Sequence, residues 1–226
     1  MNTQTFIFGS LLAIYSSILM AANHNGPTRD EKIQKIVNRC LESVENGHGV
    51  LRYTNRESSD YIFKDNDEIH IKIKIQLRYQ LSFTDEKFTQ AKILIEEAKN
   101  FIREFYAQHH LNVEIKLEHA KFYRNSMNPY PRPTSNAHIV YIRKEMGDAM
   151  SVLTWGVNFQ WDPIMRGQIY AHEFSHLLGL QDEYDTPRAT RIGEVDNIMR
   201  NWDAPKPKLY PHQIKQIISP LCPRIL

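Results

Sequence analysis

A strict alternation of apolar and polar residues constrains the fold of this chain more than any other feature of its sequence. From residue 69 to residue 83 every odd position is Ile, Leu, Tyr or Phe, and every even position is polar. A period of two matches a β-strand, because successive side chains of a strand point to opposite faces of its sheet. The run therefore predicts a long strand that is buried on one face.

A long amphipathic helix and a second alternating strand follow this run. Thr84 or Asp85 can cap a helix whose apolar residues recur at helical spacing from Phe88 to Phe105, and residues 111–117 alternate again. A strand, a helix and a strand in succession predict a right-handed βαβ crossover and a parallel strand pair. The expected fold class is α/β or α+β. Shorter patterns predict a helix over residues 33–44, strands over residues 138–142 and 151–159, and helices over residues 165–179 and 210–218.

Composition narrows the class of protein. The chain has 226 residues, of which 24% are charged, and these values describe an ordinary globular domain with a hydrophobic core. Its 28 basic and 26 acidic side chains are nearly balanced, so it lacks the cationic excess of a phosphate-binding surface. We therefore expect no nucleic-acid partner.

The N-terminal residues have the pattern of a secretory signal peptide. Residues 6–20 are mostly apolar and are followed by Ala21 and Ala22, and no Asp, Glu, Lys or Arg precedes Arg29. The run is short for a membrane span of about 20 apolar residues, so we expect cleavage rather than an uncleaved anchor, which is the alternative.

A signal peptide at the N-terminus predicts the domain boundaries of the chain and the cellular location of the protein. Residues 1–22 are the signal peptide, and residues 23–66 form an N-terminal helical subdomain or a short pro-segment. Residues 67–226 form the main domain. The protein is expected to be secreted, extracellular or periplasmic, with no stable membrane partner after cleavage.

Two cysteines lie near opposite ends of the mature chain. In an oxidising compartment Cys40 and Cys222 are expected to form a disulfide, since no other thiol competes for either of them. Two buried free thiols are one alternative. In another, the Cys40 thiolate caps a metal ion in a latent precursor.

The sequence His172-Glu173-Phe174-Ser175-His176 has the pattern H-E-x-x-H within a predicted helix. Residues i and i+4 lie on the same side of a helix, so His172 and His176 can both bind one zinc ion. Glu173 lies beside the position of a metal-bound water and can take its proton as a general base. The alternative is a pair of helix histidines that contact structural carboxylates.

The residues that follow extend this motif to His172-Glu173-x-x-His176-x-x-Gly179-x-x-Asp182. The extended motif resembles the metzincin clan of zinc metallopeptidases, and its Asp resembles the third ligand of the snapalysin family. The resemblance implies that Gly179 reverses the chain in a left-handed conformation, which glycine accepts at a helix C-terminus.

The same resemblance implies further features of the site and of the fold. Met199 would provide the Met-turn beneath the metal, although a core methionine is the alternative reading. The implied fold is a mixed twisted sheet with a long helix and an active-site helix, and a small C-terminal subdomain with the Met-turn and the final helix. In several metzincins a Tyr two positions after the Met-turn residue assists the transition state, but this chain has Asn201 there.

Other assignments of the site remain open. Glu194 is the main competitor of Asp182 as third zinc ligand, and Glu183 is a weaker one. Trp155 and Trp202 would line the substrate cleft, or alternatively pack in the core. A substrate would lie extended along the strand predicted over residues 151–159.

These features predict a secreted zinc-dependent endopeptidase that acts on a protein or peptide substrate and holds one catalytic Zn²⁺ ion. One alternative is a zinc hydrolase with a single target, such as a toxin, an effector or a cell-wall amidase. Another is a binding module that keeps the zinc without catalysis, although a purely structural site usually has four protein ligands.

Overall fold

The computed structural model describes residues 26–44, 61–79, 83–121, 137–144, 154–184 and 194–222. The signal peptide predicted over residues 1–22 lies outside this part of the chain. The helices and strands follow in the order α2 (Arg29–Ser43), β1 (Tyr61–Asp65), β2 (Glu68–Tyr79), α3 (Asp85–Ala107), β3 (Leu111–Lys121), β4 (His138–Lys144), β5 (Thr154–Val157), α4 (Pro163–Leu177) and α5 (Pro211–Ile218). This arrangement confirms a mixed α/β fold.

The central strand of the sheet is β2, the strand predicted from the alternating run. Its odd-numbered side chains, from Ile69 to Tyr79, are at most 3% exposed. β3 pairs with β2 in parallel, with Ile69 opposite Leu111 at the start of the register. On the other side of β2, β1 pairs antiparallel and β4 pairs parallel, and β5 pairs in parallel with β4. The predicted parallel pair flanking a long helix is therefore confirmed.

Strand β1 was not predicted. It forms a hairpin with β2, in which Asp65 pairs with Glu68 and Asn66 adopts a positive φ of 53°. Its sequence, Tyr-Ile-Phe-Lys-Asp, does not alternate between apolar and polar residues, so it carries no strand period and this strand depends on pairing with β2. The domain boundary expected after residue 66 falls within this hairpin.

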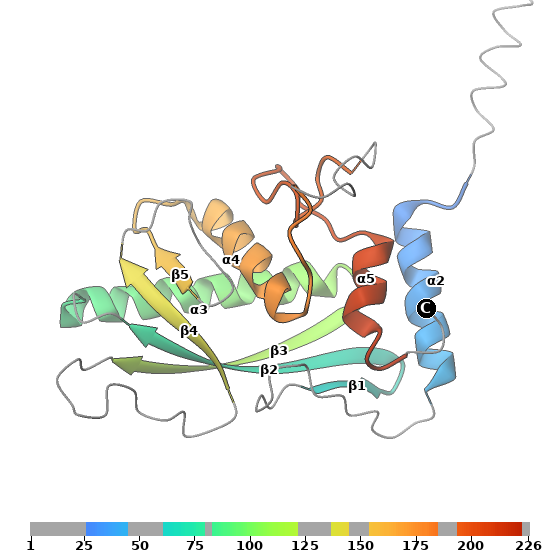
Figure 1. The fold of residues 1–226 in the computed structure, drawn as a ribbon, viewed down its shortest axis with the longest axis horizontal. Coiled ribbons are helices and arrows are strands. Elements are labelled where there is room, and N and C mark those ends of the chain that lie inside the picture. Colours follow the sequence, from blue (N-terminus) through green and yellow to red (C-terminus); the bar gives the residue numbers. More distant parts are fainter. Residues whose placement is uncertain are drawn as a thin grey trace, which may run out of the picture.

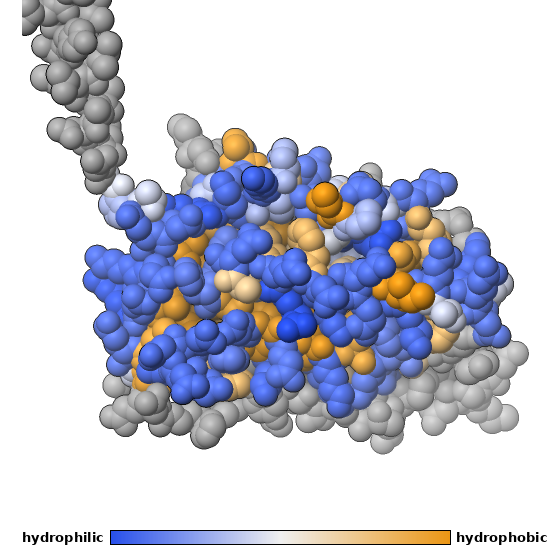
Figure 2. Space-filling model, turned by 180° about the vertical axis from the view of Figure 1, so that it is seen from behind, coloured by the Kyte–Doolittle hydropathy of each residue, from blue (hydrophilic) through white to orange (hydrophobic). Residues whose placement is uncertain are grey.

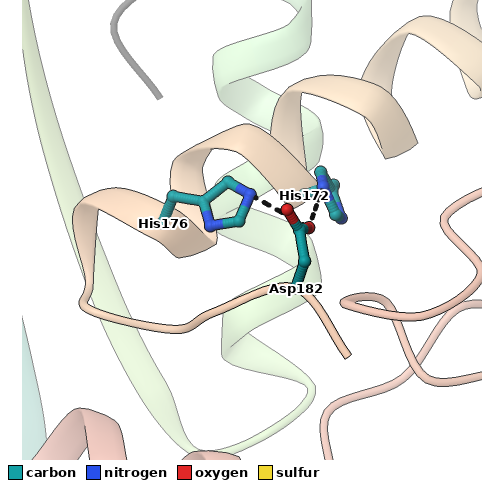
Figure 3. Close-up of side chains that lie close together, drawn as sticks. All are labelled: His172, His176 and Asp182. Atoms are coloured by element: carbon teal, nitrogen blue, oxygen red, sulfur yellow. Dashed lines mark ion pairs between the residues drawn. The ribbon is translucent and has the colours of Figure 1, made fainter. Parts of the chain in front are cut away.

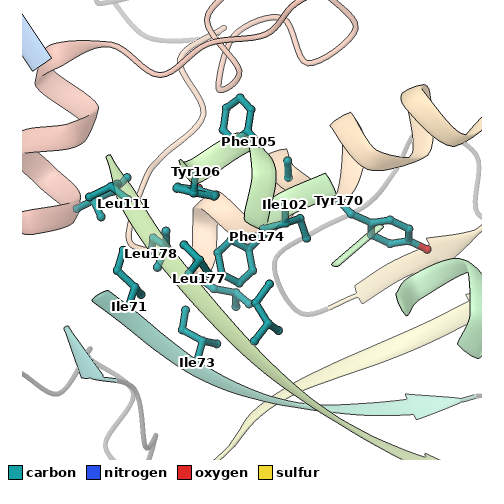
Figure 4. Packing of buried hydrophobic residues seen from close by; sticks show 14 of the residues in the cluster. Ile71, Ile73, Ile102, Phe105, Tyr106, Leu111, Tyr170, Phe174, Leu177 and Leu178 are labelled. Carbon is teal, nitrogen blue, oxygen red and sulfur yellow. The ribbon is translucent and has the colours of Figure 1, made fainter. Parts of the chain in front are cut away.

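Helices α3 and α4 lie over the same face of the sheet (Figure 1). They approach closely at Gly167 of α4, where an added Cβ atom would lie 2.4 Å from Cγ of Phe101 on α3. Tyr106 Oη of α3 also lies 2.6 Å from Ser175 Oγ of α4. Figure 4 shows apolar side chains of these helices meeting those of β2 and β3. This packing fixes α4, which carries the H-E-x-x-H motif, against the rest of the core.

Helices α2 and α5 lie side by side (Figure 1), and a disulfide joins α2 to the segment that follows α5. The predicted disulfide between Cys40 and Cys222 is confirmed, with the two Cα atoms 5.5 Å apart. The buried side chains of α2 belong to the same hydrophobic cluster as those of α5 and the sheet. Lys64 of β1 donates a hydrogen bond to the carbonyl of Leu41 at 2.8 Å, which further ties α2 to the sheet.

The surface seen from behind is mostly hydrophilic, with apolar residues in small separate areas (Figure 2). Scattered apolar exposure of this kind is ordinary for a globular domain. Within the described ranges, no helix combines the length and the apolar character needed to cross a membrane.

Candidate metal centre

Helix α4 presents two histidines on one face. Asp162 caps its first turn and accepts hydrogen bonds from the backbone N–H groups of Ile164 and Met165, at 2.9 and 3.0 Å. Residues four apart lie on the same side of a helix, and the rings of His172 and His176 have centroids 4.9 Å apart. The local sequence therefore places both imidazoles beside one point in space.

The end of α4 returns the chain toward these histidines. The N–H of Leu180 donates to the carbonyl of Ser175 at 3.1 Å, and the N–H of Gly179 donates to that of His176 at 2.9 Å. These two hydrogen bonds are those of a Schellman motif, and Gly179 has the left-handed φ of 87° that the motif requires. The predicted pivot at Gly179 is confirmed, and it brings Asp182 back alongside the helix.

Three candidate ligand side chains converge after this turn (Figure 3). Asp182 Oδ1 lies 3.2 Å from His172 Nε2 and 3.3 Å from His176 Nε2. The potential ligand atoms of the three residues all lie within 4.8 Å of one another. The structure therefore brings together the three residues that the sequence proposed as metal ligands.

Hydrogen bonds to backbone carbonyls set the tautomer of both histidines. His172 Nδ1 lies 2.8 Å from the carbonyl oxygen of Ile198, and His176 Nδ1 lies 2.9 Å from that of Leu180. A carbonyl oxygen only accepts, so each Nδ1 must carry the proton that it donates. In the neutral rings both Nε2 atoms then keep their lone pairs, and these nitrogens are the ones nearest Asp182.

The donor set fits a tetrahedral cation. Burial first, and then the nearby His176, lower the pKa of His172, which favours the neutral ring. Asp182 Oδ1 is buried and has no hydrogen-bond partner among the described residues. Neighbouring ligand atoms around a tetrahedral zinc ion are about 3.4 Å apart, from bond lengths of about 2.0–2.2 Å, which matches the distances found here. Two nitrogens and one carboxylate oxygen form a typical zinc ligand set.

Glu173 directly follows the candidate ligand His172 in helix α4. It is 4% exposed, and its Oε2 atom has no hydrogen-bond partner within the described part of the chain. Burial first, and then the charge of Asp182, raise the pKa of Glu173 to about 8. A cation bound by the three ligand atoms would lower this pKa, because it favours the carboxylate. A buried carboxyl group that can exchange a proton therefore lies beside the candidate ligands.

The competing carboxylates lie in a different group. Potential ligand atoms of Glu183, Glu194 and His212 also lie within 4.8 Å of one another. Burial alone would raise the pKa of Glu183, but the hydrogen bond and charge of His212 and the hydrogen bonds from Gln213 and Asn197 hold it below its ordinary range. Of the three carboxylates considered for the third ligand position, Asp182 is the one beside the histidine pair.

The remaining predicted site residues are Met199, Trp155 and Trp202, and they differ in how deeply they are buried. Met199 is fully buried and directly follows Ile198, whose carbonyl holds His172. Trp155 is 2% exposed and its ring packs 5.3 Å from that of Tyr170, so it occupies the core rather than an open cleft. Trp202 is half-buried.

Sequence reasoning missed several residues that contact Glu183, the residue after the candidate ligand Asp182. Asn197 and Gln213 are fully buried and hydrogen-bond to Glu183, and His212 contacts the same carboxylate. The available signal was the position of Gln213 four residues before Ile217, on the apolar side of the final helix. A polar residue on that side is expected to be buried, but the sequence does not identify its partner.

The metzincin resemblance and the identity of the metal stay predictions from the motif and its geometry. In comparisons with known proteins, neither a protein-family model nor a curated sequence matches this chain.

Proposed function

We propose that this protein is a zinc-dependent peptidase of metzincin type that hydrolyses peptide bonds. One observation carries the proposal: two Nε2 atoms with lone pairs and one carboxylate oxygen meet at about 3.2–3.3 Å beside a buried glutamate. Two histidines and one carboxylate leave a fourth tetrahedral position open, which is typical of catalytic zinc sites.

The residues that would hold the ion are His172, His176 and Asp182. When bound, zinc would acidify a water molecule and polarise the substrate carbonyl. The chain's own contribution to the reaction comes from Glu173, whose Oε2 has no hydrogen-bond partner among the described residues and would accept a proton from the attacking water. The water oxygen bonds to the carbonyl carbon, the carbon–nitrogen bond breaks, and Glu173 returns the proton to the leaving amine.

The substrate would lie extended beside β5, which falls within the strand predicted over residues 151–159. Within the described part of the chain, β5 pairs with a strand on one side only, which is β4. Tyr170 Oη of α4 donates a hydrogen bond to the carbonyl of Gly156 at 2.8 Å, so β5 is held against the metal-binding helix. A strand added to β5 would be recognised mainly through its backbone.

Secretion belongs to the same proposal. The disulfide between Cys40 and Cys222 is compatible with an oxidising compartment, where such bonds persist. The mature enzyme would then meet its protein or peptide substrate outside the cytosol.

The test is cleavage of a mixed peptide library by the purified protein with zinc, with new termini identified by mass spectrometry. The control is Glu173→Gln, which keeps the shape of the side chain but cannot take the proton. We expect cleavage by the unmodified protein, loss on adding a chelator, and loss in the variant although it still binds zinc. Equal cleavage by the two proteins would refute the role of Glu173, and zinc binding with no cleavage would favour a single-target hydrolase or a binding module.

A further inference from the structure

A buried polar network lies next to the candidate metal centre. Its centre is the carboxylate of Glu183, the residue after Asp182. Glu183 Oε1 accepts hydrogen bonds from His212 Nε2 at 2.8 Å and from Gln213 Nε2 at 3.0 Å, and its Oε2 accepts one from Asn197 Nδ2 at 3.0 Å. The partners come from α5 and from the segment before Met199, which are distant from Glu183 in sequence.

The two amides of the network are completely hydrogen-bonded. Asn197 Oδ1 accepts from the N–H of Met199 at 2.9 Å and from Gln213 Nε2 at 2.7 Å, and its Nδ2 also donates to Glu194 at 3.2 Å. Gln213 Oε1 accepts from the N–H of Tyr210 at 2.8 Å. Fully satisfied buried networks hold one arrangement, because any rearrangement leaves a buried polar group unpaired.

The network holds two segments that adjoin helix α4 at the candidate metal centre. One segment contains the ligand Asp182 and then Glu183, and the other contains Ile198, whose carbonyl sets the tautomer of His172. The N–H of Glu183 donates to the carbonyl of Met199 at 2.9 Å, so the two segments are also joined through their backbones. A displacement of the Glu183 side chain would therefore disturb a ligand and the support of another ligand together.

We propose that Glu183 is a positioning residue for metal binding, and that His212 and Gln213 of α5 hold it in place. The inference rests on the proposed zinc site, and it assigns to the C-terminal helix a role in metal affinity. Glu183, Glu194 and His212 are not proposed as a second metal site, because hydrogen bonds within the protein already engage the Glu183 carboxylate.

The principal test is Glu183→Gln. All three side-chain partners of Glu183 donate hydrogen bonds in the observed arrangement, so a glutamine amide group would face a donor in either orientation. Loss of an outer-shell partner typically weakens metal affinity about 10- to 100-fold, and we expect a loss in that range.

Two further variants keep the test decisive if Glu183→Gln does not fold. His212 is half-buried on α5, so His212→Ala removes one donor without opening the core. We expect it to weaken zinc binding, and His212→Gln, which can still donate a hydrogen bond, to restore part of the affinity. Ile214→Val is the matched control on α5, because Ile214 is fully buried in the hydrophobic cluster and its side chain makes no contribution to the network.

Zinc affinity would be measured by competition with a chromogenic chelator, at a temperature where circular dichroism shows every variant folded. The absorption spectrum with Co²⁺ would report ligand number and geometry at the site. We expect an altered Co²⁺ spectrum in Glu183→Gln and an unchanged one in Ile214→Val.

The outcomes separate this inference from the proposed function. If the unmodified protein binds neither zinc nor Co²⁺, the proposed function itself fails. If it binds zinc and the Glu183 and His212 variants bind with the same affinity and spectrum, the metal site stands and the positioning role is overturned. Equal weakening in Ile214→Val would also overturn it, because the effect would then follow from lost stability alone.

Discussion

Acid should destabilise this protein through one buried histidine, His109, which lies two residues after the end of α3. It is 3% exposed, and its Nε2 accepts a hydrogen bond from the N–H of Leu209 at 3.3 Å. Its Nδ1 has no hydrogen-bond partner among the described residues. Protonation would therefore remove an acceptor from Leu209 and leave a buried charge.

Burial lowers the pKa of His109 from 6.5 to about 4. The positive charges of Arg29, His110 and Lys208 act in the same direction, and the negative charge of Asp30 opposes them. The folded protein thus binds this proton less readily than the unfolded chain does. The stabilisation is present above the unfolded pKa of 6.5 and is lost as the pH falls toward the folded pKa.

The difference between the two pKa values sets the magnitude of the effect. Each pKa unit corresponds to about 1.4 kcal/mol, so His109 should remove about 3 kcal/mol from the free energy of unfolding between pH 7 and pH 4. This is a large share of the stability of an ordinary domain, which is about 5–15 kcal/mol.

The assay is urea denaturation of the unmodified protein and of His109→Gln at several pH values. Glutamine does not titrate, and its carbonyl can still accept from the N–H of Leu209. Other groups titrate equally in both proteins, so the difference in their free energies of unfolding isolates His109. We expect the unmodified protein to lose about 3 kcal/mol more than the variant on acidification. Parallel pH profiles would refute the reasoning.

Three further predictions concern the metal centre, the helix contact and the disulfide. Asp182→Ala should lose most of the zinc affinity seen in a chelator competition, whereas Glu194→Ala should lose much less; the reverse order would assign the third ligand to Glu194. Gly167→Ala should lower the melting temperature, because the new methyl group overlaps Phe101 and such overpacking costs about 1–3 kcal/mol; an unchanged value would mean that the helices separate freely. Replacing Cys40 and Cys222 with serine removes a crosslink between residues 182 positions apart, and it should lower the free energy of unfolding, measured in urea, by up to about 5 kcal/mol. An unchanged free energy of unfolding would mean that the crosslink does not constrain the unfolded chain.

Local patterns in the sequence identified the elements that carry the ligands. The alternation over β2 and β3 and the helical spacing of α3 predicted the parallel pair and its connecting helix. The spacing of His172 and His176 predicted a shared helix face, and Gly179 predicted the turn that follows. These features depend on residues close in sequence, whose relative positions are set by the geometry of one helix, strand or turn.

Contacts between distant segments were decided only by the tertiary structure. The carbonyl of Ile198 supports His172 from 26 residues away, and Gln213 reaches Glu183 from 30 residues away. The same holds for β1, which is a strand because it pairs with β2, and for Trp155, which the core encloses. Hydrogen bonding and burial at these positions depend on which segments pack together, and a local period carries no information about that choice.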